Sequence, residues 1–220
     1  MKGQQLALAV QLREAASFAS YWAGRNAATV ATLRALDRDG LLYGPAGSGR
    51  THLLQALCRE RGGAYLPLRE CRDYGPEVLD GFDAAPLLCL DDLDAVLDDS
   101  AWALSLLRLL DRRRAAGLQT VVSSEHPPEA LATLPDLRTR LAAGVLLGLC
   151  ALSDEECAQL LQERAQARGL ELKDEVVRWL QRTQARSPGA LLEALERLDR
   201  ASLSQKRRLS LPFVQATLAR

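Results

Sequence analysis

A glycine-rich stretch that begins at position 44 has the residue types and the spacing of a phosphate-binding loop. It reads GPAGSGRT, the pattern G-x-x-x-x-G-K-[ST] with arginine in place of lysine. Glycines let the backbone curl so that several N–H groups point at one anion, and the start of the next helix adds its positive end. The last threonine can ligate Mg²⁺. We therefore expect these eight residues to bind phosphate: Gly44, Pro45, Ala46, Gly47, Ser48, Gly49, Arg50 and Thr51.

The flanking residues favour this interpretation. A short apolar run at 41–43 precedes the loop, and a helical pattern that includes His52 follows it. The alternative, a glycine-rich turn before an ordinary helix, is disfavoured by the complete spacing. Arginine has a planar fork where lysine has a compact ammonium group. With Arg50 in place of lysine, we expect the chain still to bind nucleotide but to hydrolyse it only weakly by itself.

Two carboxylates follow the apolar run 87–90 and suggest metal chemistry. Asp91 at the carboxyl end of a parallel strand falls beside the phosphate loop, where it can hold a Mg²⁺ shell with Thr51. Asp92 occupies the position that would polarise an attacking water. The alternative is a strand that runs into a solvated acidic turn, because Asp94, Asp98 and Asp99 follow.

Two further polar positions are open to more than one interpretation. Glu125, at the end of the expected strand 120–123, could sense a γ-phosphate or belong to a capping turn before the prolines. Arg140 could reach into a neighbouring nucleotide site as an arginine finger, but locally a surface arginine is favoured.

An apolar alternation near the N-terminus could dock into a partner's pocket as an extended peptide. Its residues are Gln5, Leu6, Leu8 and Val10. A frayed tail, or a strand that packs on the chain's own sheet, is the local preference.

Strand patterns alternate with helical ones up to position 150 and predict a doubly wound, parallel α/β sheet with helices on both faces. The expected strands are 41–43, 64–68, 87–90, 120–123 and 145–149. The proline at position 67 places the second strand near an edge, and the uniformly apolar third strand is expected to be buried on both faces. Helices are expected at 26–36 and 102–110.

After position 150 every pattern is helical. Ser153 and Glu156 have the spacing of a capping box. The expected helices are 155–168, 174–182, 190–203 and 212–218. We therefore divide the chain into a tail at 1–15, an α/β domain at 16–150 and a small helical domain at 151–220.

Composition excludes several classes of protein. The chain has 220 residues, of which 48% are hydrophobic, and no apolar run long enough to cross a membrane or serve as a signal peptide. Five cysteines without a C-x-x-C pair and two histidines argue against zinc, and we expect reduced, apolar cysteines. A net charge of zero argues against a polyanion-binding surface. The basic runs 112–114 and 206–208 are expected to be solvated helix ends.

Taken together, these motifs resemble the DnaA-related AAA+ family, and within it the Hda group of DnaA inactivators. The segment 18–26, with Tyr21 and Asn26, is similar to the part of the family that contacts the nucleotide base. Residues 44–51 resemble its Walker A motif and 87–92 its Walker B motif. Further matches are Glu125 with the first sensor, Arg140 with the arginine finger, and Gln5, Leu6, Leu8 and Val10 with the sliding-clamp-binding peptide.

The resemblance implies an AAA+ domain with a helical lid that binds ADP or another nucleoside diphosphate, with or without Mg²⁺. It implies a bacterial, cytoplasmic, nucleoid-associated regulator whose partners are the DNA polymerase III β sliding clamp and DnaA, with DNA reached through the clamp. Arg140 would act on ATP bound to DnaA. One departure is Gly189 in place of the second-sensor arginine; Arg186 is nearby, and whether it replaces that arginine stays open. An autonomous ATPase such as a helicase loader, a clamp-loader-like module and self-association stay open.

Overall fold

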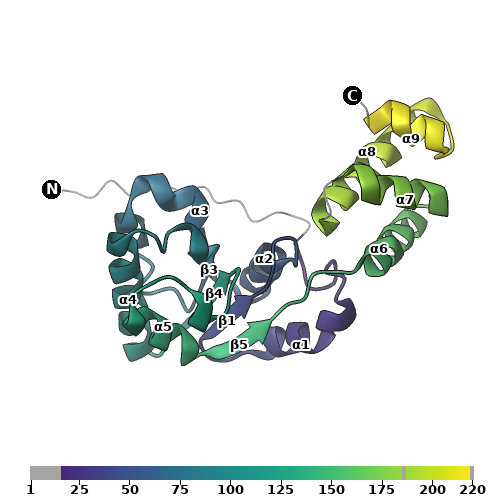
Figure 1. Ribbon diagram of the computed structural model, residues 1–220. Coiled ribbons are helices and arrows are strands. Elements are labelled where there is room, and N and C mark those ends of the chain that lie inside the picture. The colour runs from purple at the N-terminus through teal and green to yellow at the C-terminus, as the bar shows by residue number, and fades with distance from the viewer. Residues whose placement is uncertain (1–15, 185–186, 219–220) are drawn as a thin grey trace. The chain divides into compact units, whose positions relative to one another are not determined.

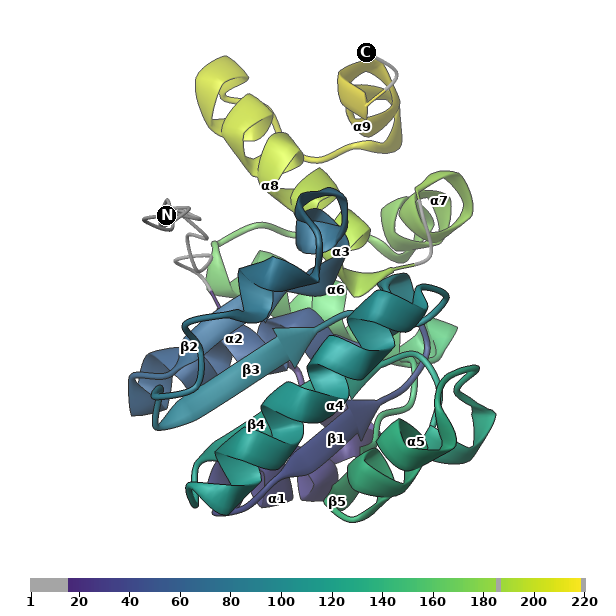
Figure 2. The same ribbon diagram turned by 90° about the vertical axis from the view of Figure 1, so that its left-hand side faces the viewer.

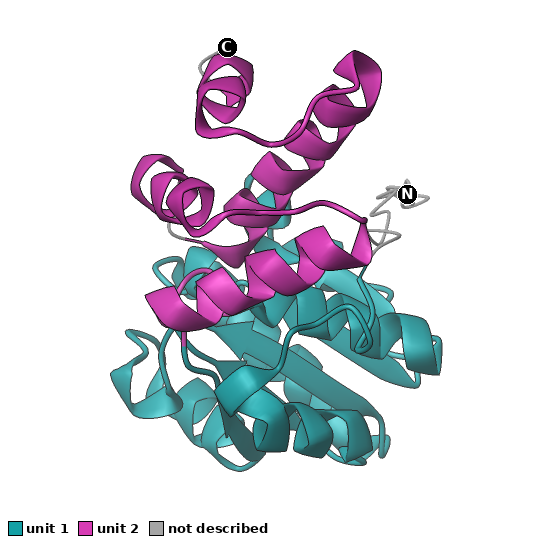
Figure 3. Ribbon diagram, turned by 90° about the vertical axis from the view of Figure 1, so that its right-hand side faces the viewer, with its two compact units in different colours: residues 1–45, 49–150 teal, residues 46–48, 151–220 magenta. Residues whose placement is uncertain are grey.

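The computed structural model describes residues 16–184 and 187–218 and contains two compact units (Figures 1 and 3). The first unit comprises Met1–Pro45 and Gly49–Cys150, and the second comprises Ala46–Ser48 and Ala151–Arg220. The first unit is an α/β layer structure and the second is helical.

Among the described residues of the first unit, five parallel strands form one sheet, as the sequence predicts. They are β1 (Gly40–Tyr43), β2 (Ala64–Pro67), β3 (Leu87–Asp91), β4 (Gln119–Ser124) and β5 (Val145–Gly148). Their order is β2-β3-β4-β1-β5, so the proline-containing β2 is an edge strand. Leu90 of β3 pairs with Val122 of β4, so the polar residues that follow them come to the same edge of the sheet.

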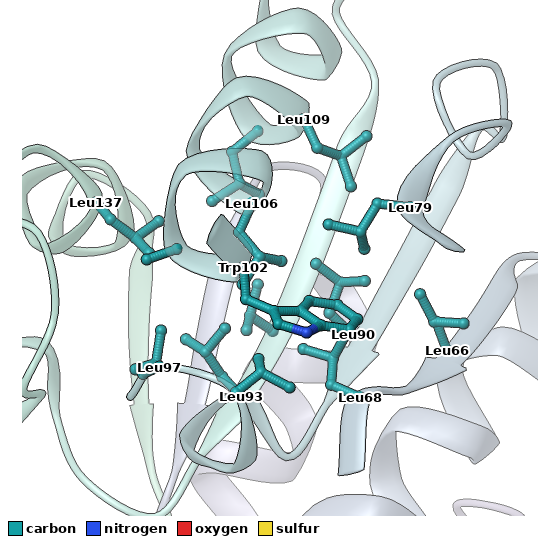
Figure 4. Packing of buried hydrophobic residues seen from close by; sticks show 14 of the residues in the cluster. Leu66, Leu68, Leu79, Leu90, Leu93, Leu97, Trp102, Leu106, Leu109 and Leu137 are labelled. Carbon is teal, nitrogen blue, oxygen red and sulfur yellow. The ribbon is translucent and has the colours of Figure 1, made fainter. Parts of the chain in front are cut away.

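Helices cover both faces of the sheet because β3 is apolar on both sides. Leu88 and Leu90 join one buried cluster, and Leu87 and Cys89 join the other. Trp102 fills the centre of the first cluster (Figure 4). The helices of this unit are α1 (Ala27–Ala35), α2 (Arg50–Arg61), α3 (Leu68–Cys71), α4 (Ser100–Ala115) and α5 (Pro135–Ala142), and its short 3-10 turns are Gly24–Asn26, Arg72–Tyr74, Pro76–Leu79, Leu93–Ala95 and Pro128–Ala130. Figure 2 shows α4 and α5 together on one face.

The basic run 112–114 differs from the expectation of a solvated helix end. Arg113 is completely buried, and its guanidinium donates hydrogen bonds to the Phe82, Ala85 and Gln119 carbonyls and to the Thr120 hydroxyl. Backbone carbonyls in the loop before β3 and at the start of β4 supply acceptors that no local pattern reveals. The arginine therefore ties together the segments that lead into β3 and β4.

In the part of the second unit that the structure describes, four helices pack around an apolar cluster of their own. They are α6 (Asp154–Ala167), α7 (Asp174–Thr183), α8 (Pro188–Gln205) and α9 (Leu211–Leu218). The predicted capping box at the start of α6 is confirmed. The Glu156 N–H donates to the Ser153 hydroxyl at 3.2 Å, and the Ser153 N–H donates to the Glu156 carboxylate at 2.8 Å.

Within residues 16–184 and 187–218, no helix combines the length and the apolar character that crossing a membrane would require. All five cysteines are free thiols, and Cys150 is the exposed one among them.

Candidate functional site

The glycine-rich loop approaches its surroundings so closely that side chains would not fit. A Cβ atom on Gly44 would lie 2.5 Å from the Leu149 carbonyl oxygen, and one on Gly49 would lie 2.5 Å from the Tyr21 ring. Gly49 also has a φ of 92° where it caps the start of α2. The loop backbone thus packs against neighbouring segments and leads into α2 at residue 50. A glycine-rich loop at a helix N-terminus can bind phosphate through its backbone N–H groups.

The guanidinium of Arg50 is held by the protein itself. It donates to the backbone carbonyl of Gly44 and, at 2.9 Å, to that of Ser124 at the end of β4. Its other terminal nitrogen lies 3.5 Å from the Asp92 carboxylate. The side chain is only 10% exposed. A lysine has three donors on one atom and could not span these acceptors, so the arginine fastens β4 to the loop.

Asp91 at the end of β3 is buried and fully engaged in hydrogen bonds. One carboxylate oxygen accepts from the Tyr65 hydroxyl at 2.6 Å. The other accepts from the Ser123 hydroxyl and, at 3.1 Å, from the Asp92 N–H. Burial and the negative charge of Asp91 raise the pKa of Tyr65, which stays a hydrogen-bond donor through the neutral range.

Asp92 is held between two arginines. One of its oxygens faces Arg50, and the other accepts from Nε of Arg69 at 3.0 Å. Its backbone is left-handed, with a φ of 58°. This conformation turns the carboxylate away from the line of β3 and toward α3, which carries Arg69.

The residues present suit a phosphate group better than a metal ion. Thr51 lies in the first turn of α2 and is partly exposed, in keeping with the expected ligand role. Both oxygens of Asp91, however, already accept hydrogen bonds from buried hydroxyl or amide donors, with which a directly bound cation would compete. Among the described residues, no three acidic, histidine or cysteine side chains are grouped so as to hold a metal ion. The Mg²⁺ expected from Thr51 and Asp91 stays a prediction.

The segment predicted to contact the nucleotide base packs against the loop and its helix. The Tyr21 and His52 rings lie 5.7 Å apart, and His52 is also within hydrogen-bonding distance of the Ser17 carbonyl at 2.9 Å. Asn26 is buried and is paired with the backbone of Cys150, donating at 2.9 Å and accepting at 2.8 Å. Asn26 thus fastens the end of the α/β unit, a role that its sequence context does not reveal.

Glu125, the expected first sensor, is exposed immediately after β4. Its backbone N–H donates to the Asp94 carboxylate at 2.6 Å. The Ser124 hydroxyl donates to the His126 carbonyl at 2.5 Å. These bonds fix the turn before the prolines, one within the turn and one to Asp94 in the segment after β3.

Arg140 lies in α5 and forms an ion pair with Asp111 of α4. Its side chain is 34% exposed, while its Nε atom is buried and has no hydrogen-bond partner within the described residues. The Arg140 guanidinium is therefore partly exposed to solvent, and one of its N–H donors lacks an acceptor among the described residues.

Several predicted positions cannot be compared with the structure. Arg186 and the peptide residues Gln5, Leu6, Leu8 and Val10 lie outside the described residues. Gly189 lies in the first turn of α8, which the Ser187 side chain caps.

Sequence reasoning missed three residues that bind the Asp91 and Asp92 carboxylates, namely Tyr65, Ser123 and Arg69. The β3–β4 register could have revealed Ser123, because it follows the partner of Leu90. Tyr65 lies on β2 beside β3, but its hydroxyl reaches Asp91 only through the length of the ring. Arg69 depends on the short helix α3, which no sequence signal indicates.

Comparison with known proteins agrees with this arrangement. Residues 154–218 match the family model described as Hda, lid domain. Residues 154–218 therefore resemble the lid domain of Hda, and the chain has the fold of DnaA domain III. Domain III of the Thermotoga maritima replication initiation protein DnaA has a TM-score of 0.73 and 17% identity, with 95% of this chain and 98% of that chain covered.

Two other solved structures show the same fold. AMPPCP-bound DnaA from Aquifex aeolicus has a TM-score of 0.63 and 20% identity, covering 88% of this chain and 72% of that one. The Holliday junction branch migration motor RuvB from Thermotoga maritima has a TM-score of 0.62 and 17% identity, covering 95% and 73%. The chain thus shares with these structures the fold of a parallel sheet followed by a helical region.

Proposed function

We propose that this protein regulates replication initiation by stimulating hydrolysis of ATP bound to DnaA. The observation that carries the proposal is the match of residues 154–218 to the Hda lid domain. Hda-type inactivation needs a group that acts on the partner's nucleotide, and Arg140 is the candidate. An arginine finger supplied to another subunit contributes about 10³–10⁵ in rate in well-studied nucleotide hydrolases.

The state of Asp92 supports action on a partner over hydrolysis by the chain itself. A carboxylate that polarises water must accept a hydrogen bond from that water. Both oxygens of Asp92 already face arginines, Arg50 at 3.5 Å and Arg69 at 3.0 Å. The chain's own nucleotide would then be a structural ligand that stabilises the folded protein by mass action.

The nucleotide proposed for this site is ADP, held by residues 44–51. The close approach of Gly44 and Gly49 to neighbouring atoms and the start of α2 support a phosphate cradle. The DnaA structure from Aquifex aeolicus contains AMPPCP, an adenine nucleotide analogue. Tyr21, which belongs to the segment predicted to contact the base, lies against Gly49 of this loop.

The sliding clamp is the proposed docking partner. The alternation of Gln5, Leu6 and Leu8 suits an extended peptide that inserts apolar side chains into a pocket. Tethering to a DNA-loaded clamp raises the local concentration of the regulator near DnaA. DNA would be reached through the clamp.

The test is single-turnover hydrolysis of ATP pre-bound to DnaA, with and without DNA-loaded clamp. We expect stimulation by this protein that requires the clamp and that falls when Leu6 and Leu8 are both replaced by alanine. Lys2→Ala is a matched control in the same segment and should retain stimulation. Stimulation that is independent of the clamp would contradict the tethering step. ATP turnover by the isolated protein that matches its turnover with DnaA would favour an autonomous ATPase.

A further inference from the structure

Two arginines occupy the surroundings in which a phosphate-loop protein ordinarily holds its metal ion. Arg50 and Arg69 face opposite oxygens of Asp92, at 3.5 Å and 3.0 Å. Both oxygens of Asp91 beside it accept hydrogen bonds, from Tyr65 on one side and from Ser123 and the Asp92 backbone on the other. Both carboxylates that could anchor a divalent cation are thus already in use.

The local charge leads to the same conclusion. Asp91 and Asp92 carry two negative charges, and Arg50 and Arg69 carry two positive ones, so the four side chains are neutral together. A Mg²⁺ ion beside Asp92 would add two positive charges next to two guanidinium groups and would compete with both for one carboxylate. A diphosphate, in contrast, supplies the negative charge that two guanidinium groups can bind.

We propose that the loop binds the diphosphate of a nucleoside diphosphate without a divalent cation, with Arg69 taking the place of the metal. The inference rests on the proposed nucleotide site. Arg69 is suited to this role because its side chain is 66% exposed and its partner Asp92 is 25% exposed. It can therefore turn from the carboxylate to phosphate oxygens, which a planar guanidinium binds in pairs.

Arg50 has a different part in the same site. It is 10% exposed and is bonded to the Gly44 and Ser124 carbonyls, so it holds the loop in shape and cannot swing outward with the same ease. It contributes a fixed positive charge near the start of α2. Arg69 is the arginine that turns toward the diphosphate. Because the two arginines have different roles, substitutions can test the proposal.

The experiment is calorimetric titration of the full chain, freed of nucleotide, with ADP in EDTA and in excess Mg²⁺. We expect the two dissociation constants to agree within about threefold, because no carboxylate is free to hold the metal. Arg69→Ala should weaken ADP binding about tenfold or more in EDTA, and Mg²⁺ should restore part of the loss through the released Asp92 oxygen.

Arg72→Ala is the matched control. Arg72 is a nearby exposed arginine whose ion pair, at 2.6 Å, is with Asp98 instead of Asp92. Its loss should leave ADP binding within about twofold of the parent. Circular dichroism of each variant checks that the fold is retained, which is expected because both side chains are exposed.

Three results would overturn the inference. Binding of ADP that is about tenfold weaker in EDTA than in Mg²⁺ would contradict metal independence, while the proposed nucleotide site would stand. Equal binding by Arg69→Ala and Arg72→Ala would remove Arg69 from the site. No binding of ADP under either condition would overturn both the inference and the nucleotide part of the proposed function.

Discussion

Replacing Arg113 with methionine should destabilise the α/β unit markedly. Arg113 is completely buried and donates to the Thr120 hydroxyl at 2.9 Å and to the carbonyls of Phe82, Ala85 and Gln119 at 2.5, 2.9 and 2.7 Å. Methionine keeps an unbranched apolar stem and removes every donor. The acceptors that remain lie in the loop before β3 and at the start of β4.

The expected loss is a difference between two larger quantities. A hydrogen bond from a charged donor contributes about 1.5–3 kcal/mol to stability, so four such bonds set an upper bound of about 6–12 kcal/mol. Burying a guanidinium costs several kcal/mol, which its removal returns. Burial also lowers the pKa of Arg113, in keeping with that cost. Because part of the loop before β3 is open to water, we expect a net loss of about 2–4 kcal/mol in the free energy of unfolding.

Urea unfolding followed by tryptophan fluorescence measures this change. Trp102 lies in the core of the α/β unit, while Trp179 packs against the core of the helical unit. A Trp179→Phe background therefore restricts the signal to the α/β unit, which matters because two units need not unfold together. A loss of about 3 kcal/mol corresponds to a fall in the midpoint of about 1–2 M urea.

Arg114→Met is the matched control, because Arg114 is exposed at the adjacent position. It should change the unfolding free energy by less than about 0.5 kcal/mol. Equal effects of the two substitutions, or a loss below about 1 kcal/mol for Arg113→Met, would refute the reasoning that the buried bonds fasten β3 and β4.

Three further predictions concern individual contacts. Asp111→Asn should raise stimulated hydrolysis of DnaA-bound ATP by up to about fivefold, because the partly exposed ion pair that restrains Arg140 is worth at most about 1 kcal/mol. A fall in stimulation would show instead that Asp111 positions Arg140. Burial and the charge of Asp91 raise the pKa of Tyr65 in the folded state, so the stability that the neutral hydroxyl confers is complete below about pH 10 and is lost as the pH rises above that value. Tyr65→Phe should therefore flatten the decline in unfolding free energy between about pH 9 and 11. An unchanged slope would contradict the assignment. Ser153→Ala should cost the helical unit about 1 kcal/mol of stability, measured by Trp179 fluorescence, with no change in the α/β unit.

The sequence predicts the features that depend on local patterns. The apolar run before Asp91 specifies a strand buried on both faces, and Pro67 marks an edge strand because it lacks an N–H donor. The capping box follows from Ser153 and Glu156 alone, since both bonds join residues three apart.

The rest depends on contacts between distant segments. Arg113 belongs to a basic run that resembles a solvated helix end, and only the fold supplies its buried acceptors. The pairing of Asp92 with Arg69 spans 23 positions and requires α3 to follow β2 directly. Asn26 reaches Cys150 across 124 positions, so its role in fastening the unit has no local signal.

The most direct test of the proposed regulator is hydrolysis of DnaA-bound ATP with the Arg140→Ala variant in the presence of DNA-loaded clamp. The account predicts that stimulation falls by about 10³ or more, toward the rate of DnaA alone. Stability should change by less than about 1 kcal/mol, because the pair with Asp111 is partly exposed. Arg138→Ala, in the same helix, should retain stimulation. Full stimulation by Arg140→Ala, with the clamp demonstrably bound, would contradict the central claim.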